Sequence, residues 1–426
     1  MTLPTVAPLN EKALARRIKD HVVGRSHEFF AVVHPGFEET ARRELQGLGV
    51  AGPEVRGSGG VAFSGRLEDA WRVNMGAGTL SRLLMRLARF KATGFAEFRA
   101  RLAGCPWELH LAERARVRFE VSSSGSRLWH EGRLEQEAMQ AVAGRLAAHG
   151  RSAVFPGAAA SGPEPLQLIF IRMEENRCLV SLDTSGELLY RRGRDKLIGT
   201  APLRETLACA ILREAGIERY GVLLDPFCGS GTFALEAGAI FCGRPVNSGR
   251  AFAFQNWPAH KPARFRHLRD ELERRFRENA PSGARKIYCS DIDPGAAETT
   301  RRNLERADLA AIAEVDPADF FRLHPPAVDP ARVLLALNPP YGERQQPGGD
   351  IASFYRRIGD KVRRDYAGCG WAIIVPGLEI EKALGLPHDK KILFNNGGIS
   401  VALLIHDSVT RNARPMEDKR GKVAER

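Results

Sequence analysis

Apolar positions along residues 28–103 alternate between strand-like runs and helical spacing. The elements predicted from this pattern are strands at 29–33 and 61–63 and helices at 37–48 and 67–75. Strands and helices that alternate within so short a segment are typical of a small α+β unit of the ferredoxin-like kind.

Residues 80–87 continue the helical spacing into a segment with charged positions. Leucines fall on one side of the predicted helix, and Arg82, Arg86 and Arg89 fall on the other. Two interpretations of these arginines remain open, an RNA-facing surface or a solvated helix face.

A second pattern of the same type covers residues 104–190 and predicts another small α+β domain. The expected elements are a strand at 117–121, a helix at 134–149 and strands at 166–172 and 178–185. A loose loop is expected at 158–163, where small residues and proline cluster.

From residue 220 onward the pattern changes to buried strands that are followed by helices. Residues 222–224 predict a short parallel strand, Gly229 and Gly231 permit a tight turn, and good helix formers follow from Thr232. This order places a ligand at the carboxyl end of a strand and the amino end of a helix, where open α/β sheets bind ligands. Two glycines alone are weak evidence for a ligand-binding loop, so the interpretation depends on the neighbouring residues.

Asp225 stands between the strand and the glycine turn. A carboxylate at that place would repel nucleotide phosphates, and the G-x-x-x-x-G-K-[ST] pattern of phosphate-binding loops is absent. A cofactor that carries positive groups and no phosphate fits better, and S-adenosylmethionine has an ammonium and a sulfonium. The alternative is that Asp225 only caps the following helix.

Two later strand ends also carry polar side chains. Asp291 ends the predicted strand that starts at Lys286, where an acid can accept both hydroxyls of an adenosyl ribose. The sequence Asn338-Pro339-Pro340-Tyr341 follows the apolar strand at 333–337. Together with Asp225, these positions predict a cofactor site with the reacting group beside it.

Asn-Pro-Pro-Tyr suits methylation of an exocyclic amine, whose lone pair is normally delocalised into the base. The Asn338 side-chain oxygen and the Pro339 carbonyl can each accept one N–H, which turns the lone pair toward a sulfonium methyl group. Proline fixes the backbone and adds no donor, and Tyr341 offers a ring on which an extruded base stacks. The alternative is an ordinary turn.

Three segments resemble the amino-methylating class I methyltransferases. They are D-P-F-C-G-S-G-T at 225–232, S-D-I-D-P at 290–294 and N-P-P-Y-G-E-R at 338–344. With the junction at 185–208, the chain is similar to the THUMP-domain RNA guanine-N2 methyltransferases, and nearest to their 23S ribosomal RNA branch, over about residues 28–408.

This resemblance implies a Rossmann-like class I methyltransferase domain preceded by ferredoxin-like and THUMP-like RNA-binding domains. The expected divisions are a flexible extension at 1–27, the ferredoxin-like domain at 28–103, the THUMP-like domain at 104–190, a linker and helix at 191–219, the methyltransferase domain at 220–408 and a flexible basic tail at 409–426.

The resemblance also assigns further contacts with the cofactor. It places Phe227 and Ile292 beside the cofactor, and Asp319 and Phe320 beside its adenine ring, with Asp316 as a rival for the acid that accepts the adenine amine. The closing hairpin of the family corresponds to 391–401, where two neighbouring asparagines, Asn395 and Asn396, are both candidates for the family position.

Two basic segments suggest nucleic acid. An insertion at 241–285 between the first two strands of the methyltransferase domain combines Phe252, Phe254 and Trp257 with an arginine-rich helix, a combination that suits nucleic acid, although its acids indicate a partly solvated face. The junction before residue 197 carries four cations, for which phosphate contact is one interpretation. They are Arg191, Arg192, Arg194 and Lys196.

The net charge and the cysteines indicate the class of partner and the cellular compartment. The net charge of +12 suits a polyanionic partner, although a generally arginine-rich composition would give the same value. The 7 cysteines form no C-x-x-C pair and accompany no histidine cluster, so a reduced cytoplasmic setting without a metal site is expected. No apolar run is long enough for a membrane helix, so a soluble protein without a membrane partner is expected.

The sequence therefore predicts an S-adenosylmethionine-dependent methyltransferase that acts on guanine N2 of 23S ribosomal RNA, with a monomer favoured. Asn-Pro-Pro-Tyr serves adenine amines equally well, so a transfer RNA guanine-N2 or an adenine-N6 methyltransferase remains an alternative. A rival of another class is a non-catalytic RNA-binding factor for ribosome assembly.

Overall fold

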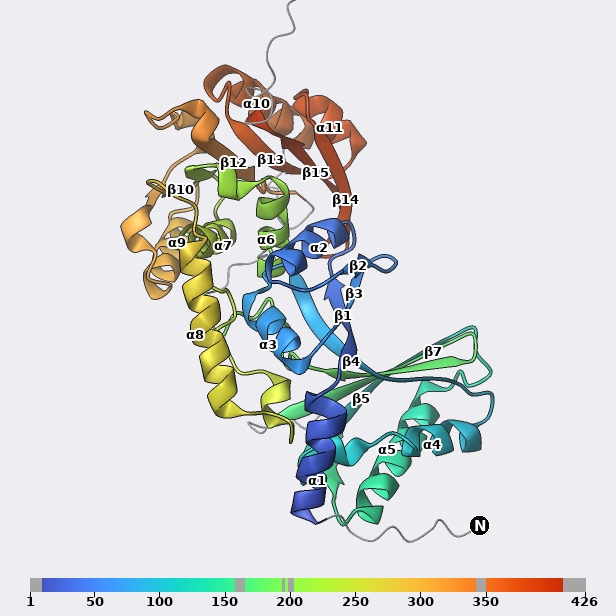
Figure 1. The fold of residues 1–426 in the computed structure, drawn as a ribbon. Coiled ribbons are helices and arrows are strands. Elements are labelled where there is room, and N and C mark those ends of the chain that lie inside the picture. The colour runs from blue at the N-terminus through green and yellow to red at the C-terminus, as the bar shows by residue number, and fades with distance from the viewer. Residues whose placement is uncertain (1–9, 158–164, 194–195, 198–202, 342–349, 409–426) are drawn as a thin grey trace, which may run out of the picture. The chain divides into compact units, whose positions relative to one another are not determined.

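The computed structural model describes residues 10–157, 165–193, 196–197, 203–341 and 350–408 (Figure 1). The chain forms two compact units, each built from two separate stretches. The amino-terminal unit comprises residues 1–194 and 244–279, and the carboxy-terminal unit comprises residues 195–243 and 280–426. Several expectations lie outside the described residues, namely the tail at 409–426, Arg194, the loop at 158–163 and the last three residues of N-P-P-Y-G-E-R.

The amino-terminal unit is organised around an eight-stranded sheet with the order β2-β3-β1-β4-β8-β7-β5-β6. Its strands are β1 (His27–Val33), β2 (Glu54–Val55), β3 (Gly60–Gly65), β4 (Leu80–Lys91), β5 (Ala115–Ser124), β6 (Ala153–Val154), β7 (Leu166–Glu174) and β8 (Arg177–Asp183). Its helices are α1 (Glu11–Ile18), the π-helix η1 (Lys19–Val23), α2 (Glu38–Gly47), α3 (Leu67–Gly76), α4 (Phe95–Ala103), the short η2 (Trp107–Leu109), α5 (Glu131–Ala148), the short η4 (Ala253–Asn256) and α8 (Pro262–Glu278).

Strand β4 joins the two small domains expected from the sequence, because it pairs antiparallel with β1 on one side and with β8 on the other. The expected helix at 80–87 is therefore wrong. Its leucine spacing is compatible with a helix, but pairing with two strands prevails over the local pattern.

Two of the three arginines, Arg82 and Arg86, serve neither of the two uses expected of them. Arg82 forms an ion pair with the buried Asp183, and Arg86 donates to Ser181 Oγ at 2.8 Å. Arg86 also lies over the Phe30 ring, 4.3 Å from its centroid. These two side chains are held by contacts within the unit.

Part of the segment 1–27, which was expected to be a flexible extension, is packed into the amino-terminal unit. Asn10 caps α1 by accepting from the Ala13 N–H at 2.8 Å. Ile18 and Val22 are buried in the core of the amino-terminal unit, and Arg17 forms an ion pair with Glu108 at 3.0 Å. Residues 10–26 therefore form an ordered part of this unit.

The insertion between the first two strands of the methyltransferase domain packs into the amino-terminal unit. Phe254 stacks on Trp71 with ring centroids 5.6 Å apart, and Phe265 packs edge-on against Trp71 at 6.0 Å. Phe252, Phe254 and Trp257 are all buried, so the expectation that these aromatic residues contact nucleic acid is wrong. The methyltransferase domain expected at 220–408 is therefore interrupted in sequence, because residues 244–279 belong to the amino-terminal unit.

The carboxy-terminal unit has a seven-stranded sheet with the order β11-β10-β9-β12-β13-β15-β14. Its strands are β9 (Val222–Asp225), β10 (Lys286–Asp291), β11 (Ala313–Pro317), β12 (Val333–Leu337), β13 (Gly370–Val375), β14 (Lys390–Asn396) and β15 (Ile399–His406). Its helices are α6 (Glu205–Glu214), α7 (Thr232–Phe241), α9 (Pro294–Arg306), α10 (Ile351–Asp365), α11 (Leu378–Leu384) and the short η3 (Ile217–Arg219), η5 (Ala310–Ile312), η6 (Phe320–Arg322) and η7 (Pro330–Arg332).

This second sheet is parallel from β11 to β13, and β15 pairs antiparallel with both β13 and β14. Strands β9 and β12 are buried at every residue, as expected for parallel strands in the middle of an α/β sheet. The strand order reverses between β9 and β12, so their carboxyl ends form the switch point at which such sheets bind ligands.

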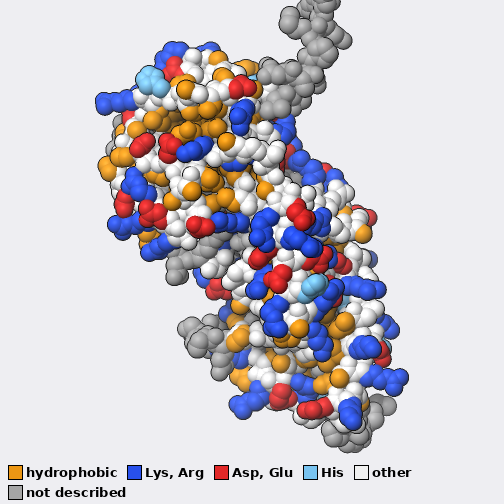
Figure 2. All heavy atoms as spheres, turned by 60° about the vertical axis from the view of Figure 1, so that its left-hand side comes forward, with side chains coloured by type: hydrophobic (Ala, Val, Ile, Leu, Met, Phe, Trp, Pro, Cys, Tyr) orange, Lys and Arg blue, Asp and Glu red, His pale blue; other side chains and the backbone are white. Residues whose placement is uncertain are grey.

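Lys and Arg side chains are spread over the face shown in Figure 2, with Asp and Glu among them, so this face carries no continuous basic surface. None of the 7 cysteines forms a disulfide. Within the described ranges, no helix combines the length and the hydropathy that crossing a bilayer requires.

Candidate active site

Asp225 lies at the carboxyl end of β9 with only 1% of its surface exposed. Neither of its carboxylate oxygens has a hydrogen-bond partner among the described residues. Burial raises the pKa of this carboxyl to about 8, the charge of Asp291 adds to the rise, and the nearby Phe227 N–H offsets only part of it. A buried acid without a partner is costly when ionised, so this position favours a positively charged ligand group.

The glycine turn is held open by residues of α9. Gly229 and Gly231 have φ values of 54° and 77°, which favour glycine. A side chain at Gly231 would meet Thr300 Cγ2 at 3.0 Å. Thr300 Oγ1 donates to the Gly229 carbonyl at 2.9 Å, and Asn303 Nδ2 donates to the Ser230 carbonyl at the same distance.

Asp291 links the ends of β9 and β10. One carboxylate oxygen accepts the Gly229 N–H at 3.0 Å and the other accepts the Asp293 N–H at 3.0 Å. Each oxygen keeps a lone pair, so the carboxylate can still accept ribose hydroxyls. Ile292 beside it is 74% exposed, which leaves an apolar side chain available to a ligand ring.

The aromatic residues near the end of β11 are more buried than expected. Phe320 is 2% exposed, stacks on Tyr366 with a centroid distance of 6.0 Å and lies 5.4 Å from the Phe227 ring. Asp319 accepts the Phe321 N–H at 3.0 Å and so caps η6. Phe320 therefore belongs to the core beneath this end of the sheet.

A cavity of about 230 Å³ opens next to these residues, and Asp225 and Phe320 line it. Asp316 also lines this cavity, whereas Asp319 and Ile292 do not. Of the two rival acids, the geometry thus favours Asp316 for this cavity. Ser290 lines it as well, and its buried hydroxyl has no hydrogen-bond partner among the described residues.

Asn338 directly follows β12, and its side-chain oxygen is buried without a hydrogen-bond partner among the described residues. In an asparagine that only shaped a turn, this oxygen would accept a hydrogen bond from a nearby backbone N–H. The unpaired oxygen of Asn338 is therefore available to accept an N–H from a ligand, as the amine chemistry requires.

Tyr341 is more enclosed than a stacking platform would be, with 8% of its surface exposed. Its hydroxyl accepts a hydrogen bond from Asn396 Nδ2 at 2.6 Å, and burial raises its pKa. Asn395 instead accepts the Gly398 N–H at 2.8 Å and closes the β14–β15 hairpin. The two asparagines that the sequence could not distinguish thus have different partners.

Lys196 contributes to the glycine turn, a role that sequence reasoning missed. Its ammonium group donates to Thr232 Oγ1 at 2.7 Å and to Glu205 at 2.9 Å. Arg192 is also buried and donates to the Gly78 carbonyl at 2.7 Å. Both cations are engaged within the protein, which argues against the phosphate contacts considered for them.

The arrangement suits a cation-bearing cofactor and an amine. Among the residues that the structure describes, no group of three or more His, Cys, Asp or Glu side chains is arranged to hold a metal ion. The buried Asp225 carboxylate and the buried Asn338 oxygen are two acceptors at neighbouring strand ends, since β9 pairs with β12.

Comparison with known proteins agrees with this geometry. Residues 192–404 match the family described as RMKL-like methyltransferase domain, and residues 28–84 match the RlmL ferredoxin-like domain. A ribosomal RNA large subunit methyltransferase K/L of Allochromatium vinosum is 33% identical over 389 residues, which cover 89% of this chain and 51% of that protein. A putative RNA methyltransferase of Synechocystis is 28% identical over 89% of this chain and 96% of its own length.

Solved structures show the same fold. The putative methyltransferase SMU.472, whose crystal structure contains SAH, superposes with a TM-score of 0.79 at 24% identity, over 90% of this chain and 98% of that one. The chain spans about half the length of the K/L relatives that it matches. On the match to residues 192–404, which are half of its length, the chain belongs to the family of the RMKL-like methyltransferase domain.

Proposed function

We propose that this protein transfers a methyl group from S-adenosylmethionine to the exocyclic N2 amine of a guanine in 23S ribosomal RNA. The observation that carries the proposal is the pair of buried, unpartnered acceptors at neighbouring strand ends, the Asp225 carboxylate and the Asn338 oxygen. The names of the K/L relatives support large-subunit ribosomal RNA as the substrate.

The residues present fit the cofactor. Asp225 faces its positive groups, the Gly229–Gly231 turn lets bare backbone approach it, and Asp291 accepts its ribose hydroxyls. When bound, S-adenosylmethionine supplies a methyl group on a sulfonium, which is the electrophile of the reaction. The positive groups of the bound cofactor would then balance the charge of the Asp225 carboxylate, so this buried group would no longer carry an unmatched charge.

The amine is activated by hydrogen bonds rather than by a strong base. The Asn338 oxygen and the Pro339 carbonyl each accept one N–H of the amine, which directs its lone pair out of the plane of the base. The proton leaves to water after transfer, so most of the rate comes from positioning the two reactants. A ring nitrogen without hydrogens offers nothing to this pair of acceptors, which favours an amine as the target.

Nucleoside mass spectrometry tests the reaction and the substrate together. The full chain and S-adenosylmethionine are incubated with ribosomal RNA from a strain that lacks the gene, and the digested RNA is searched for methylated nucleosides. N2-methylguanosine that is absent from an Asn338→Ala reaction supports the proposal.

Other products would change the proposal in defined ways. N6-methyladenosine would keep the mechanism and refute the guanine assignment, and N2-methylguanosine formed only on transfer RNA would refute the ribosomal substrate. If neither free RNA nor pre-ribosomal particles are methylated and no cofactor binds by calorimetry, the protein is a non-catalytic assembly factor instead.

A further inference from the structure

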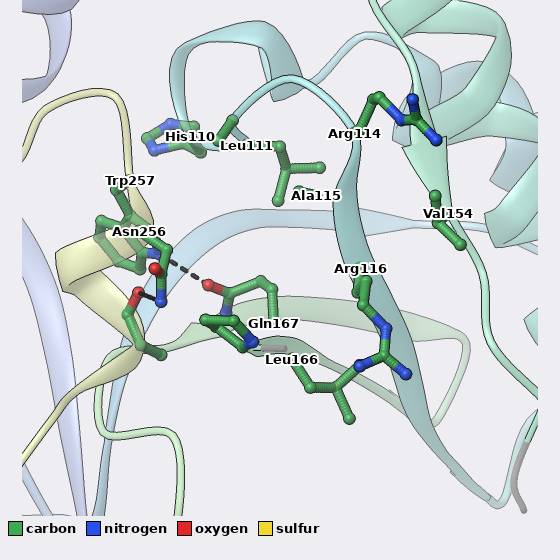
Figure 3. A pocket seen from close by; sticks show the side chains of 13 residues that line it. His110, Leu111, Arg114, Ala115, Arg116, Val154, Leu166, Gln167, Asn256 and Trp257 are labelled. Atoms are coloured by element: carbon green, nitrogen blue, oxygen red, sulfur yellow. Dashed lines mark hydrogen bonds between the residues drawn. The ribbon is translucent and has the colours of Figure 1, made fainter. Parts of the chain in front are cut away.

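The cavity of about 520 Å³ in the amino-terminal unit contains no residue of the candidate active site (Figure 3). Part of its wall is fixed within that unit, because the Trp257 indole N–H donates to Gln167 Oε1 at 2.6 Å. The features that bear on the reacting amine lie instead in the carboxy-terminal unit, at the edge of the sheet where Asn338 follows β12.

The hairpin of β14 and β15 ends at this same edge. β15 pairs antiparallel with both β13 and β14, so β14 runs parallel to β12. The last residue of β14, Asn396, lies opposite Ile399 across a two-residue turn of Gly397 and Gly398. Both glycines have positive φ values, 61° and 93°, as a two-residue hairpin turn of this kind requires.

The hairpin contacts the Asn-Pro-Pro-Tyr segment. Asn396 Nδ2 donates to the Tyr341 hydroxyl at 2.6 Å. Residues that lie directly opposite each other in an antiparallel pair present their side chains to the same face, with Cβ atoms about 4.5–5.5 Å apart. Ile399 is directly opposite Asn396, so its side chain lies on the face of the hairpin that contacts Tyr341.

Ile399 remains 39% exposed, although it is apolar. Further from the tip, Phe394 and Val401 are paired on the same face, and both are buried. The tip itself is open, since a side chain added at either glycine of the turn would meet nothing within 4 Å. Asn395 accepts the Gly398 N–H at 2.8 Å, which fixes the turn. An apolar side chain on a fixed, open tip can enter a ligand with little reorganisation of the protein.

The proposed amine chemistry requires the target base to leave any base pair that it forms. Asn338 and Pro339 together accept both N–H groups of the amine, whereas a guanine in a Watson–Crick pair already donates one of them to its partner. The base must also reach acceptors at the end of a buried strand, which a base inside a helix cannot do. Extrusion of the base leaves a gap between its two neighbours in the RNA.

We propose that Ile399 is a wedge that enters this gap and packs between the two bases that flank the extruded one. Proteins that open or kink nucleic acids insert apolar side chains, isoleucine among them, between base steps. The inserted side chain stabilises the extruded state relative to the stacked state, so a larger fraction of the bound RNA has its amine at Asn338. This inference rests on the proposed function and names a residue that positions its substrate.

Steady-state methylation of 23S ribosomal RNA that was transcribed in vitro tests this role with the full chain and S-adenosylmethionine. Ile399→Ser removes the apolar side chain, and Ile399→Leu restores one of equal size. The matched control is Leu393→Ser, because Leu393 is a 68% exposed leucine of β14 whose side chain points to the opposite face from Asn396. Melting curves show whether each variant is folded, and calorimetry measures its cofactor Kd.

Ile399→Ser should lower kcat about tenfold, because burial of an aliphatic side chain contributes at least this factor. Ile399→Leu should restore most of the rate, and the rate of Leu393→Ser and the cofactor Kd of all three variants should match the wild type. A fully active Ile399→Ser would refute the wedge, as would an equal loss in Leu393→Ser or a failure of Ile399→Leu to restore the rate.

The dependence on Mg²⁺ distinguishes a wedge from damage to the site. Mg²⁺ screens the repulsion between RNA phosphates, so a lower concentration weakens base pairing and makes extrusion easier. The ratio of the wild-type rate to the Ile399→Ser rate should therefore fall toward one as Mg²⁺ is lowered. A ratio that stays constant would show that the substitution disturbs Tyr341 rather than the opening of the RNA, and it would refute the inference.

The same assay separates this inference from the proposed reaction. A wild-type protein that methylates no RNA would refute the reaction and the wedge together. A wild-type protein that forms N2-methylguanosine at the same rate as Ile399→Ser would refute the wedge alone.

Discussion

Asp225→Asn is expected to stabilise the cofactor-free protein while it removes cofactor binding. The folded-state pKa of Asp225 is raised from the model-peptide value of 3.8 to about 8. The folded protein therefore keeps a proton that the unfolded chain releases above about pH 4, and the stability associated with that proton is lost as the pH rises toward 8. The substitution removes this loss because an amide does not titrate.

The magnitude of the stabilisation follows from the number of pH units between the pKa of Asp225 in the unfolded chain and the pH of the measurement. At pH 7 the window spans about three pH units, so ionisation of the unfolded chain costs the wild type about 4 kcal/mol. The buried amide of the variant lacks partners for its N–H groups, which lowers the stability of the variant by about 1–3 kcal/mol. The net gain of about 1–3 kcal/mol should raise the melting temperature of the carboxy-terminal unit by roughly 2–10 °C.

Calorimetric melting at pH 5, 7 and 8.5, with and without S-adenosylmethionine, tests this reasoning. The difference between variant and wild type should widen from pH 5 to pH 8.5 without cofactor, and only the wild type should be stabilised by cofactor. Asp316→Asn is the control, because Asp316 lines the same cavity but is exposed. A variant that melts below the wild type at pH 8.5 would show that the Asp225 carboxylate is paired in the folded protein and would refute the argument.

Three further predictions concern the reacting group, the hairpin and the insertion. Asn338→Ala should lower kcat by about 100-fold or more, because it removes one of the two acceptors for the amine, and should leave the cofactor Kd within about threefold by calorimetry. Asn396→Ala should lower kcat several-fold in the methylation assay, because it leaves the enclosed Tyr341 hydroxyl without its partner at a cost of about 1 kcal/mol. Trp71→Ala should destabilise the amino-terminal unit by about 3–5 kcal/mol in urea unfolding, because Trp71 is 4% exposed and packs against Phe254 of the insertion.

Matched variants distinguish these effects from general damage. A tenfold loss of cofactor affinity in Asn338→Ala would make Asn338 a cofactor ligand rather than an amine acceptor. Asn395→Ala affects only the hairpin turn, so a loss of kcat equal to that of Asn396→Ala would contradict the role given to the Tyr341 contact. Trp129 is 72% exposed, and Trp129→Ala should leave the unfolding curve unchanged.

The site residues that could be predicted from the sequence are those that lie at the end of a predicted strand. Asp225 and Asn338 each follow a short apolar strand, so their places were readable from a few neighbouring residues. The fold class followed from the same alternation of strand and helix, and similarity to solved methyltransferases confirms it. The supports of the glycine turn were not readable, because Thr300 and Asn303 lie about 70 residues away in sequence and reach it only in the folded sheet.

The two clearest errors have the same physical origin. The 80–87 segment has leucines at helical spacing but forms part of β4, because partners on both sides complete its hydrogen bonds. Phe254 and Trp257 read as exposed nucleic-acid contacts, but they fill a core whose other side is formed by residues such as Trp71. In both cases the deciding partner lies far away in sequence, where local pattern carries no information.

The insertion also has a consequence for how the protein can be divided. The chain passes from one unit to the other three times, after residues 194, 243 and 279, so a single proteolytic nick leaves the two units covalently joined. A fragment cut at 220–408 would carry α8 without the core that covers Phe265, Leu268 and Leu272. Such a fragment would self-associate through this exposed helix, whereas one in which a short linker replaces residues 244–279 would remain monodisperse.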